Sequence, residues 1–140
     1  MIQKDKEILF KDLCARLPYN VKCEVIDRGI KIIGTLNGYT SLTDGSKLFG
    51  LSNKEYNAPD KYWQPKAQFS IEEIKPYLRT MSSMTSEEEK HFLSLKSGLE
   101  YDTNTKKIIY NTNQVDWLNE HHFDYRGLID KGLAIEIKNN

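Results

Sequence analysis

The start of the chain changes its hydrophobic period from that of a helix to that of a strand. Apolar side chains first recur at helical spacing, at Ile8, Leu9, Leu13 and Leu17. Because Pro18 cannot continue a helix, the pattern predicts an amphipathic helix over residues 6–16. From Val21 the period is two, which predicts a strand with one apolar face: Val21, Cys23 and Val25.

Turn signals then divide the chain into short strands. They are Asp27-Arg28-Gly29, Asn37-Gly38 and Asp44-Gly45, in which Gly and Asn tolerate the positive φ of tight hairpins. We expect antiparallel strands near residues 20–27, 30–36, 39–43 and 46–51. A fifth strand through Phe69, Ile71 and Ile74 would close them into a small antiparallel SH3-like barrel or leave a curled sheet.

The second half of the chain alternates helix and strand patterns. Thr85 and Glu88 have capping-box spacing and predict a helix that ends at Gly98. The stretch LEYDTNTKKIIYN predicts a short hairpin that turns at Thr103-Asn104, and Asn113 is positioned to cap a further helix. The last apolar stretch, LAIEI, predicts a terminal strand.

Composition places these elements in one α+β domain. The 140 residues are 39% hydrophobic and 29% charged, which suffices for a core without metals or disulfides. We expect residues 1–140 to form a single compact domain, with a barrel-like half at about 1–79 and an α+β appendage at about 80–140. The two cysteines, Cys14 and Cys23, are expected to be reduced, buried thiols.

Charge and hydropathy disfavour two classes of partner. Twenty basic residues balance twenty acidic ones, whereas nucleic-acid binders usually carry a basic excess. No run approaches the roughly 20 apolar residues that span a bilayer, and the N-terminus lacks a cleavable apolar leader. We therefore expect a cytoplasmic protein without membrane contact.

Trp63 lies in a long polar loop, LSNKEYNAPDKYWQPK, that carries several aromatic residues. Long loops of this kind are often functional. Two interpretations remain open for Trp63: it caps the core of the barrel, or it is exposed and anchors a partner.

The segment 116–126 concentrates the chemistry of the chain. We name Asn119, His121, His122, Asp124, Tyr125 and Arg126, together with Trp63, as candidate binding residues. The alternative is a hydrogen-bonded local structure in which Asp124 pairs with Arg126. Both histidines could hold a metal with Asp124 only if the backbone turns between them, because adjacent side chains point apart.

Motifs for catalysis are missing from the sequence. The glycines stand singly at turns rather than in phosphate-binding loops, and no serine occupies a GxSxG turn. Neither cysteine has a histidine close to it in the sequence. The pattern therefore favours a non-enzymatic protein without a cofactor.

Three stretches of the sequence are distinctive: KDLCARLPY, IEEIKPYLRTMSSMTSEEEK and DWLNEHHFDYRGLIDKGLA. Together they resemble a family of small uncharacterised proteins from phages and prophages of gut Bacteroides-type bacteria. This chain departs from the family in having Thr80 where Pro often follows KPYLR, and in ending with IEIKNN. The resemblance implies a phage accessory role in the cytoplasm of a bacterial host, and it assigns no activity to individual positions.

The first hypothesis is therefore non-catalytic binding of a host protein or a small signalling molecule. The runner-up is nucleic-acid binding through the barrel by Lys22, Arg28, Lys31 and Lys47, which zero net charge disfavours. A third is a metal-dependent hydrolase built on His121, His122 and Asp124. A structural component of the virion is a fourth.

Overall fold

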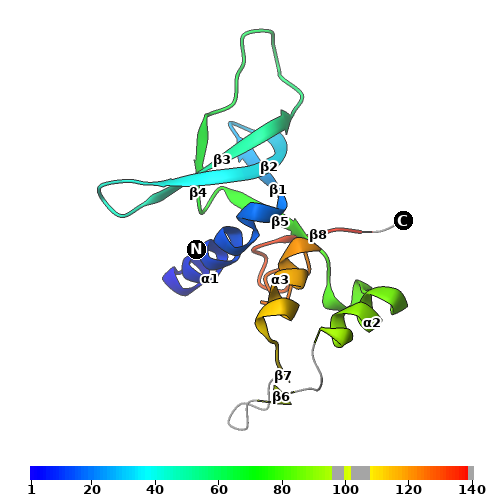
Figure 1. The fold of residues 1–140 in the computed structure, drawn as a ribbon. Helices are drawn as coiled ribbons and strands as arrows, with labels where there is room; N and C mark the ends of the chain where they lie inside the picture. The colour runs from blue at the N-terminus through cyan, green and yellow to red at the C-terminus, as the bar shows by residue number, and fades with distance from the viewer. Residues whose placement is uncertain (96–99, 102–107, 139–140) are drawn as a thin grey trace.

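The protein forms a curled sheet with helices at one side and one end (Figure 1). The structure is a computed structural model and describes residues 1–95, 100–101 and 108–138. The six-stranded sheet has the order β4-β3-β2-β1-β5-β8, in which only the β5–β8 pair is parallel. Its strands are β1 (Lys22–Asp27), β2 (Ile30–Ser41), β3 (Lys47–Glu55), β4 (Gln68–Ser70), β5 (Ile74–Leu78) and β8 (Ile135–Glu136). The sheet curls into a half-barrel, which confirms the curled-sheet form of the predicted α+β fold.

The N-terminal helix packs on the inner face of this sheet. Helix α1 (Gln3–Arg16) begins three residues before the predicted start, and η1 (Leu17–Tyr19), which contains Pro18, follows it. Leu9 and Leu13 are fully buried among the inward side chains of the strands. The outer face of the sheet carries the exposed side chains Lys22, Ile26, Lys31 and Lys75.

The predicted turn at Asn37-Gly38 is wrong. Strand β2 runs through it without interruption, and the chain reverses at residues 42–46, where the Leu42 amide donates to the Ser46 carbonyl. Both sides of Asn37 pair with the same partner strand, as in Leu36↔Leu51 and Gly38↔Gly50, with a register shift between them. The Asn-Gly pair therefore forms a bulge in a long ladder rather than a hairpin loop.

The elements after residue 79 are short. They are η2 (Met81–Ser83), α2 (Ser86–Ser94), β6 (Glu100–Tyr101), β7 (Ile108–Ile109) and α3 (Thr112–Glu120). The capping box of Thr85 and Glu88 is confirmed, whereas the cap of α3 is Asn111 and not Asn113. Strands β6 and β7 pair as the predicted hairpin does, but Thr103-Asn104 and Gly98 lie outside the described residues.

Buried apolar side chains form two clusters. The first lies between α1 and the sheet and also contains Leu128, Leu133 and Ala134 from the C-terminal segment. The second joins α2, α3 and the segment after it through Phe92, Trp117, Leu118 and Phe123. Because the C-terminal segment contributes both to the first cluster and to the edge of the sheet, the two predicted halves share a core and a sheet.

Candidate functional site

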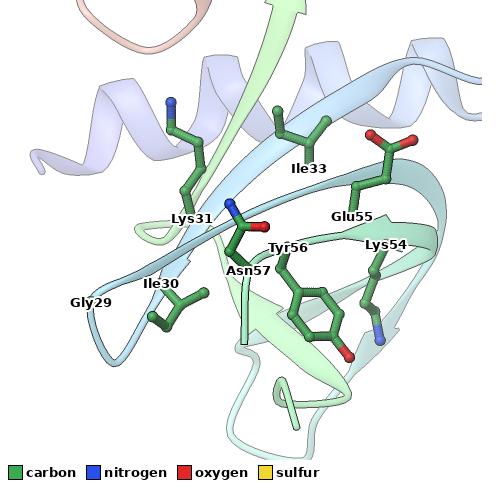
Figure 2. A pocket seen from close by; sticks show the side chains of 8 residues that line it. All are labelled: Gly29, Ile30, Lys31, Ile33, Lys54, Glu55, Tyr56 and Asn57. Atoms are coloured by element: carbon green, nitrogen blue, oxygen red, sulfur yellow. The ribbon is translucent and has the colours of Figure 1, made fainter. Parts of the chain in front are cut away.

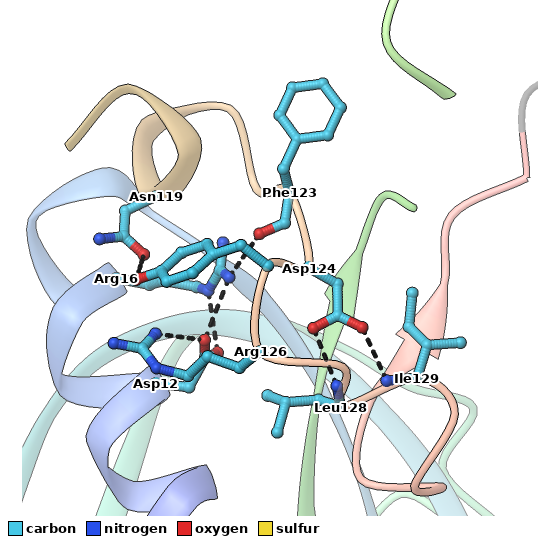
Figure 3. A network of polar contacts seen from close by, with 9 residues as sticks. Asp12, Arg16, Asn119, Phe123, Asp124, Arg126, Leu128 and Ile129 are labelled. Carbon is cyan, nitrogen blue, oxygen red and sulfur yellow. Dashed lines mark hydrogen bonds and ion pairs between the residues drawn. The ribbon is translucent and has the colours of Figure 1, made fainter. Parts of the chain in front are cut away.

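The side-chain carboxylate of Asp124 is hydrogen-bonded to the backbone of the C-terminal segment. Its two carboxylate oxygens accept hydrogen bonds from the amides of Leu128 and Ile129, each at 2.9 Å (Figure 3). An acceptor in this position satisfies amide donors at the start of the turn over residues 128–131. Asp124 therefore orders the C-terminal segment.

Arg126 pairs with Asp12 of α1 and not with Asp124, so the predicted local pair is wrong. Arg126 Nη1 lies 2.8 Å from Asp12 Oδ1, and the buried Arg16 donates to both oxygens of the same carboxylate, at 2.8 and 3.1 Å. Arg16 Nη2 also donates to the Phe123 carbonyl. Fully buried Asp12 needs these donors, because an unpaired carboxylate in the core is costly.

Asn119 and Tyr125 form a further structural contact. The Tyr125 hydroxyl donates to Asn119 Oδ1 at 2.9 Å, and Asn119 is buried at the end of α3. The Tyr125 ring lies 4.5 Å from the Arg126 guanidinium carbon and 5.6 Å from that of Arg16. Most of the segment 116–126 thus fastens α3 to α1.

The two adjacent histidines diverge. Helix α3 ends at Glu120, and the His121 ring packs against Trp117 with a centroid separation of 4.5 Å. His122 has a left-handed backbone, with φ of 63°, and its carbonyl accepts from the Arg79 amide. With Asp124 held by backbone amides, the three side chains do not converge, and no group of three or more metal-ligand residues occurs in the described part of the chain.

Trp63 lies in the loop between β3 and β4, where it is half-buried and packs against the first core cluster. The Arg28 guanidinium lies 4.9 Å from the Trp63 ring, and Tyr56 lies 5.3 Å away on the same loop. The buried carboxylate of Asp27 accepts hydrogen bonds from the Arg28 side chain and from the Lys66 amide. It therefore links the β1–β2 turn to the loop between β3 and β4. Figure 1 shows the loop at the end of the sheet opposite α3, so Trp63 and the segment 116–126 do not form one site.

The basic residues of the nucleic-acid hypothesis are also dispersed. Lys22 and Lys31 lie on the outer face of the sheet, where Lys31 pairs with Glu24 at 3.3 Å. Arg28 stacks on Trp63, and Lys47 donates to Ser41 at the β2–β3 hairpin. These four side chains do not form one continuous cationic surface.

A groove of about 470 Å³ crosses the outer face of the sheet. We call it the cross-strand groove, because its floor takes side chains from successive strands: Tyr77 of β5, Lys22 of β1, Ile33 of β2 and Glu55 of β3. Its remaining lining residues are Asn20, His122 and Ile137. Asn20 and His122 both have left-handed backbones, a conformation that commonly ends a helix: Asn20 caps η1, and His122 follows the C-cap of α3.

A larger notch of about 870 Å³ adjoins the groove and shares Ile33 and Glu55 with it. Figure 2 shows Lys31, Ile33 and Glu55 pointing to one side of the ribbon, and Lys54 and Tyr56 pointing to the other. Since the two groups of side chains point in opposite directions, the cross-strand groove is the better candidate site.

His122 is neutral where it lines the groove. Burial lowers the pKa of its imidazole, and the positive charges of Arg16, His121 and Arg79 lower it further. Its Nδ1 atom is buried without a hydrogen-bond partner among the described residues. Burial also raises the pKa of Tyr77, so its hydroxyl stays protonated as a donor near neutral pH.

Sequence reasoning named His122 but missed the groove around it. The available signal was the alternation of β1 and β2, which places Ile33 on the same outward face as Lys22 and Lys31. Tyr77 and Ile137 join them only through the β5 pairings with β1 and β8.

Comparison with known proteins gives no further assignment. No family model, no curated protein and no solved structure matches this chain. None of the helices in the described residues has the length and apolarity to cross a bilayer.

Proposed function

We propose that this protein acts by non-catalytic binding of a small molecule in the cross-strand groove. The observation that carries the proposal is the convergence of Ile33, Tyr77 and Ile137 with neutral His122 in one concave site. Small-molecule sites usually combine apolar walls with a few fixed polar groups. Of the seven candidate residues, His122 is the one that lines this groove.

Two features favour binding over turnover. The buried thiol Cys23 faces the core rather than the groove, and burial raises its pKa, which disfavours a thiolate nucleophile. The sequence has no nucleophile or phosphate-loop motif. The groove residues His122, Tyr77 and Asn20 supply hydrogen bonds that orient a ligand.

The biological setting of the proposal comes from the resemblance to phage and prophage proteins. Within it, the protein acts in the cytoplasm of a bacterial host as an accessory factor that sequesters a host small molecule. A host protein was the other expected partner, but the segment 116–126 that would present its surface is largely engaged with α1 and with the C-terminal segment.

Retention of a small molecule from the dialysable fraction of a bacterial lysate tests the proposal. The purified protein is incubated with the fraction, desalted and analysed by native mass spectrometry. We expect wild type and Tyr62→Ala to retain the same added mass, because Tyr62 is 80% exposed on the β3–β4 loop. Tyr77→Ala should lose it, because Tyr77 lines the groove.

The released compound should have an unchanged mass after long incubation. Conversion to a second compound would contradict non-catalytic binding. Failure of wild type to retain any compound, or equal retention by a folded Tyr77→Ala protein, would contradict the assignment of the groove. Circular dichroism establishes that the variant is folded.

A further inference from the structure

The end of the cross-strand groove at His122 is bordered by cationic groups. Arg16 and Arg79 both contact Phe123, the residue after His122: Arg16 Nη2 donates to the Phe123 carbonyl, and the Arg79 guanidinium carbon lies 4.2 Å from the Phe123 ring centroid. Lys22 lies on the floor of the groove and has no ion-pair partner among the described residues. This end therefore has a positive potential.

Unused donors strengthen that potential. Arg16 is completely buried, yet its Nη1 has no hydrogen-bond partner within the described part of the chain, and Nε of Arg79 is likewise buried without one there. Glu88 compensates the charge of Arg79, but Asp12 is shared between Arg16 and Arg126 and compensates only part of their charge. Buried polar groups are normally satisfied, so such atoms need a physical explanation.

The tautomer of His122 follows from these neighbours. Nδ1 is the buried ring nitrogen, and the positive charges of Arg16 and Arg79 act on the ring, so a bare Nδ1 lone pair is favoured there over an Nδ1–H group. The proton of the neutral ring is therefore assigned to Nε2. Since Nδ1 is the buried nitrogen, the Nε2–H donor is the one available to the groove.

The groove is apolar beyond this end. Ile33, Tyr77 and Ile137 provide flat or branched apolar surface. Glu55 closes the far end from β3, two strand spacings across and two residues along from Lys22 on β1, or about 12 Å. A ligand that fits has an apolar ring of modest size and a negative group at one side of it.

We propose that the ligand of the cross-strand groove is a small molecule with a flat ring and a negatively charged group. The ring lies over Ile33 and Tyr77, and the anion accepts hydrogen bonds from His122 Nε2–H and Lys22. This inference rests on the proposed function and adds the chemical class of the ligand. Carboxylate and phosphate share the required chemistry.

Two matched pairs of probes test the proposal by isothermal titration calorimetry at low salt. The pairs are indole with indole-3-acetate and adenosine with adenosine 5′-monophosphate, so the arms distinguish a carboxylate from a phosphate. In at least one pair we expect the anion to bind about tenfold more tightly than its neutral partner. Added salt should lower the affinity for the anionic probe and leave the affinity for the neutral probe unchanged.

Lys22→Gln and Lys75→Gln form the matched variants. Lys75 is exposed on the same face of the sheet, but it does not line the groove. Lys22→Gln should lower the affinity for the anionic probe about fivefold and leave the affinity for the neutral probe unchanged. Lys75→Gln should change neither affinity. A general loss of structure would weaken both members of a pair together.

Three results would overturn the inference. Equal affinity within both pairs would contradict a role for the negative charge of the ligand, while the groove could still be a binding site. Binding of none of the four probes would contradict the proposed class of ligand. The lysate experiment tests separately whether the groove binds any ligand. Tight binding of a single-stranded oligonucleotide with steep salt dependence, but not of the mononucleotide, would replace the small anion with nucleic acid.

Discussion

At the scale of single residues, Glu88 shows how one carboxylate serves two purposes. Its oxygens accept from Arg79 Nη1 and Nη2, each at 2.8 Å, and from the Thr85 amide at 2.9 Å. The hydrogen bonds from Arg79 lower the pKa of Glu88 from 4.5 to about 2, against the opposing effect of burial. Glu88 therefore caps α2 and holds it against the end of β5.

This shift makes stability depend on pH. Because the pKa of Glu88 is lowered in the folded state, its contribution is complete above pH 4.5 and is lost as pH falls toward about 2. Glu88→Gln keeps an acceptor for the Thr85 amide but removes the charge. We expect it to lower the free energy of unfolding by about 1–2 kcal/mol at neutral pH, a value that allows for solvent screening.

Urea unfolding across a pH series measures this effect. The difference between wild type and Glu88→Gln should shrink toward zero over the interval from pH 4.5 to about 2. Exposed Glu89→Gln on the same helix is the control and should follow wild type throughout. A constant difference at every pH would rule out the charge as the cause.

At the scale of elements, the long β2–β3 pair depends on close approach of the two backbones at Gly34. A Cβ atom at Gly34 would lie 3.0 Å from both Leu51 Cβ and the Ser52 carbonyl oxygen. Gly38 lies on the same strand, and no atom of the described residues lies within 4 Å of the equivalent position. The two glycines thus have different structural requirements.

Gly34→Ala is expected to destabilise the protein by about 1–3 kcal/mol, because relief of the contact requires movement of backbone. Gly38→Ala should change the free energy of unfolding by less than about 0.5 kcal/mol. Urea unfolding of both variants checks the difference. Equal effects would show that glycine entropy, and not packing against β3, determines the result.

At the scale of the whole molecule, the chain carries one tryptophan in each predicted half. Trp63 packs against the first cluster, and Trp117 belongs to the second. Leu133 is 5% exposed and belongs to the first cluster, although it lies far along the second half of the sequence. Whether the halves unfold together can therefore be measured separately at each tryptophan.

Leu133→Ala should lower the unfolding midpoint equally in Trp63→Phe and Trp117→Phe backgrounds. The expected cost is about 2–5 kcal/mol, because a buried leucine is truncated. Fluorescence of the remaining tryptophan reports each half. A shift seen only by Trp63 would show two independent units, and Leu93→Ala, at an exposed site, should shift neither signal.

The sequence alone determined features that depend on neighbouring residues. The Thr85–Glu88 capping box and the Arg28-Gly29 turn act within a few positions, and both turn residues have the positive φ that a two-residue hairpin needs. The helical spacing of Leu9 and Leu13 likewise predicted α1 and its buried face. The candidate segment 116–126 could be recognised in the same way, but not the role of each side chain in it.

Only the tertiary structure decided which distant partners those side chains meet. Arg126 pairs with Asp12, 114 positions earlier, because the buried carboxylate on α1 needs a donor, whereas both oxygens of Asp124 already accept from the amides of Leu128 and Ile129. Asn37-Gly38 stays extended because β3 pairs with the residues on both sides of it. The groove at His122 is likewise made by strand pairing, which brings Lys22, Ile33 and Tyr77 to one face, and such long-range pairings have no local signature.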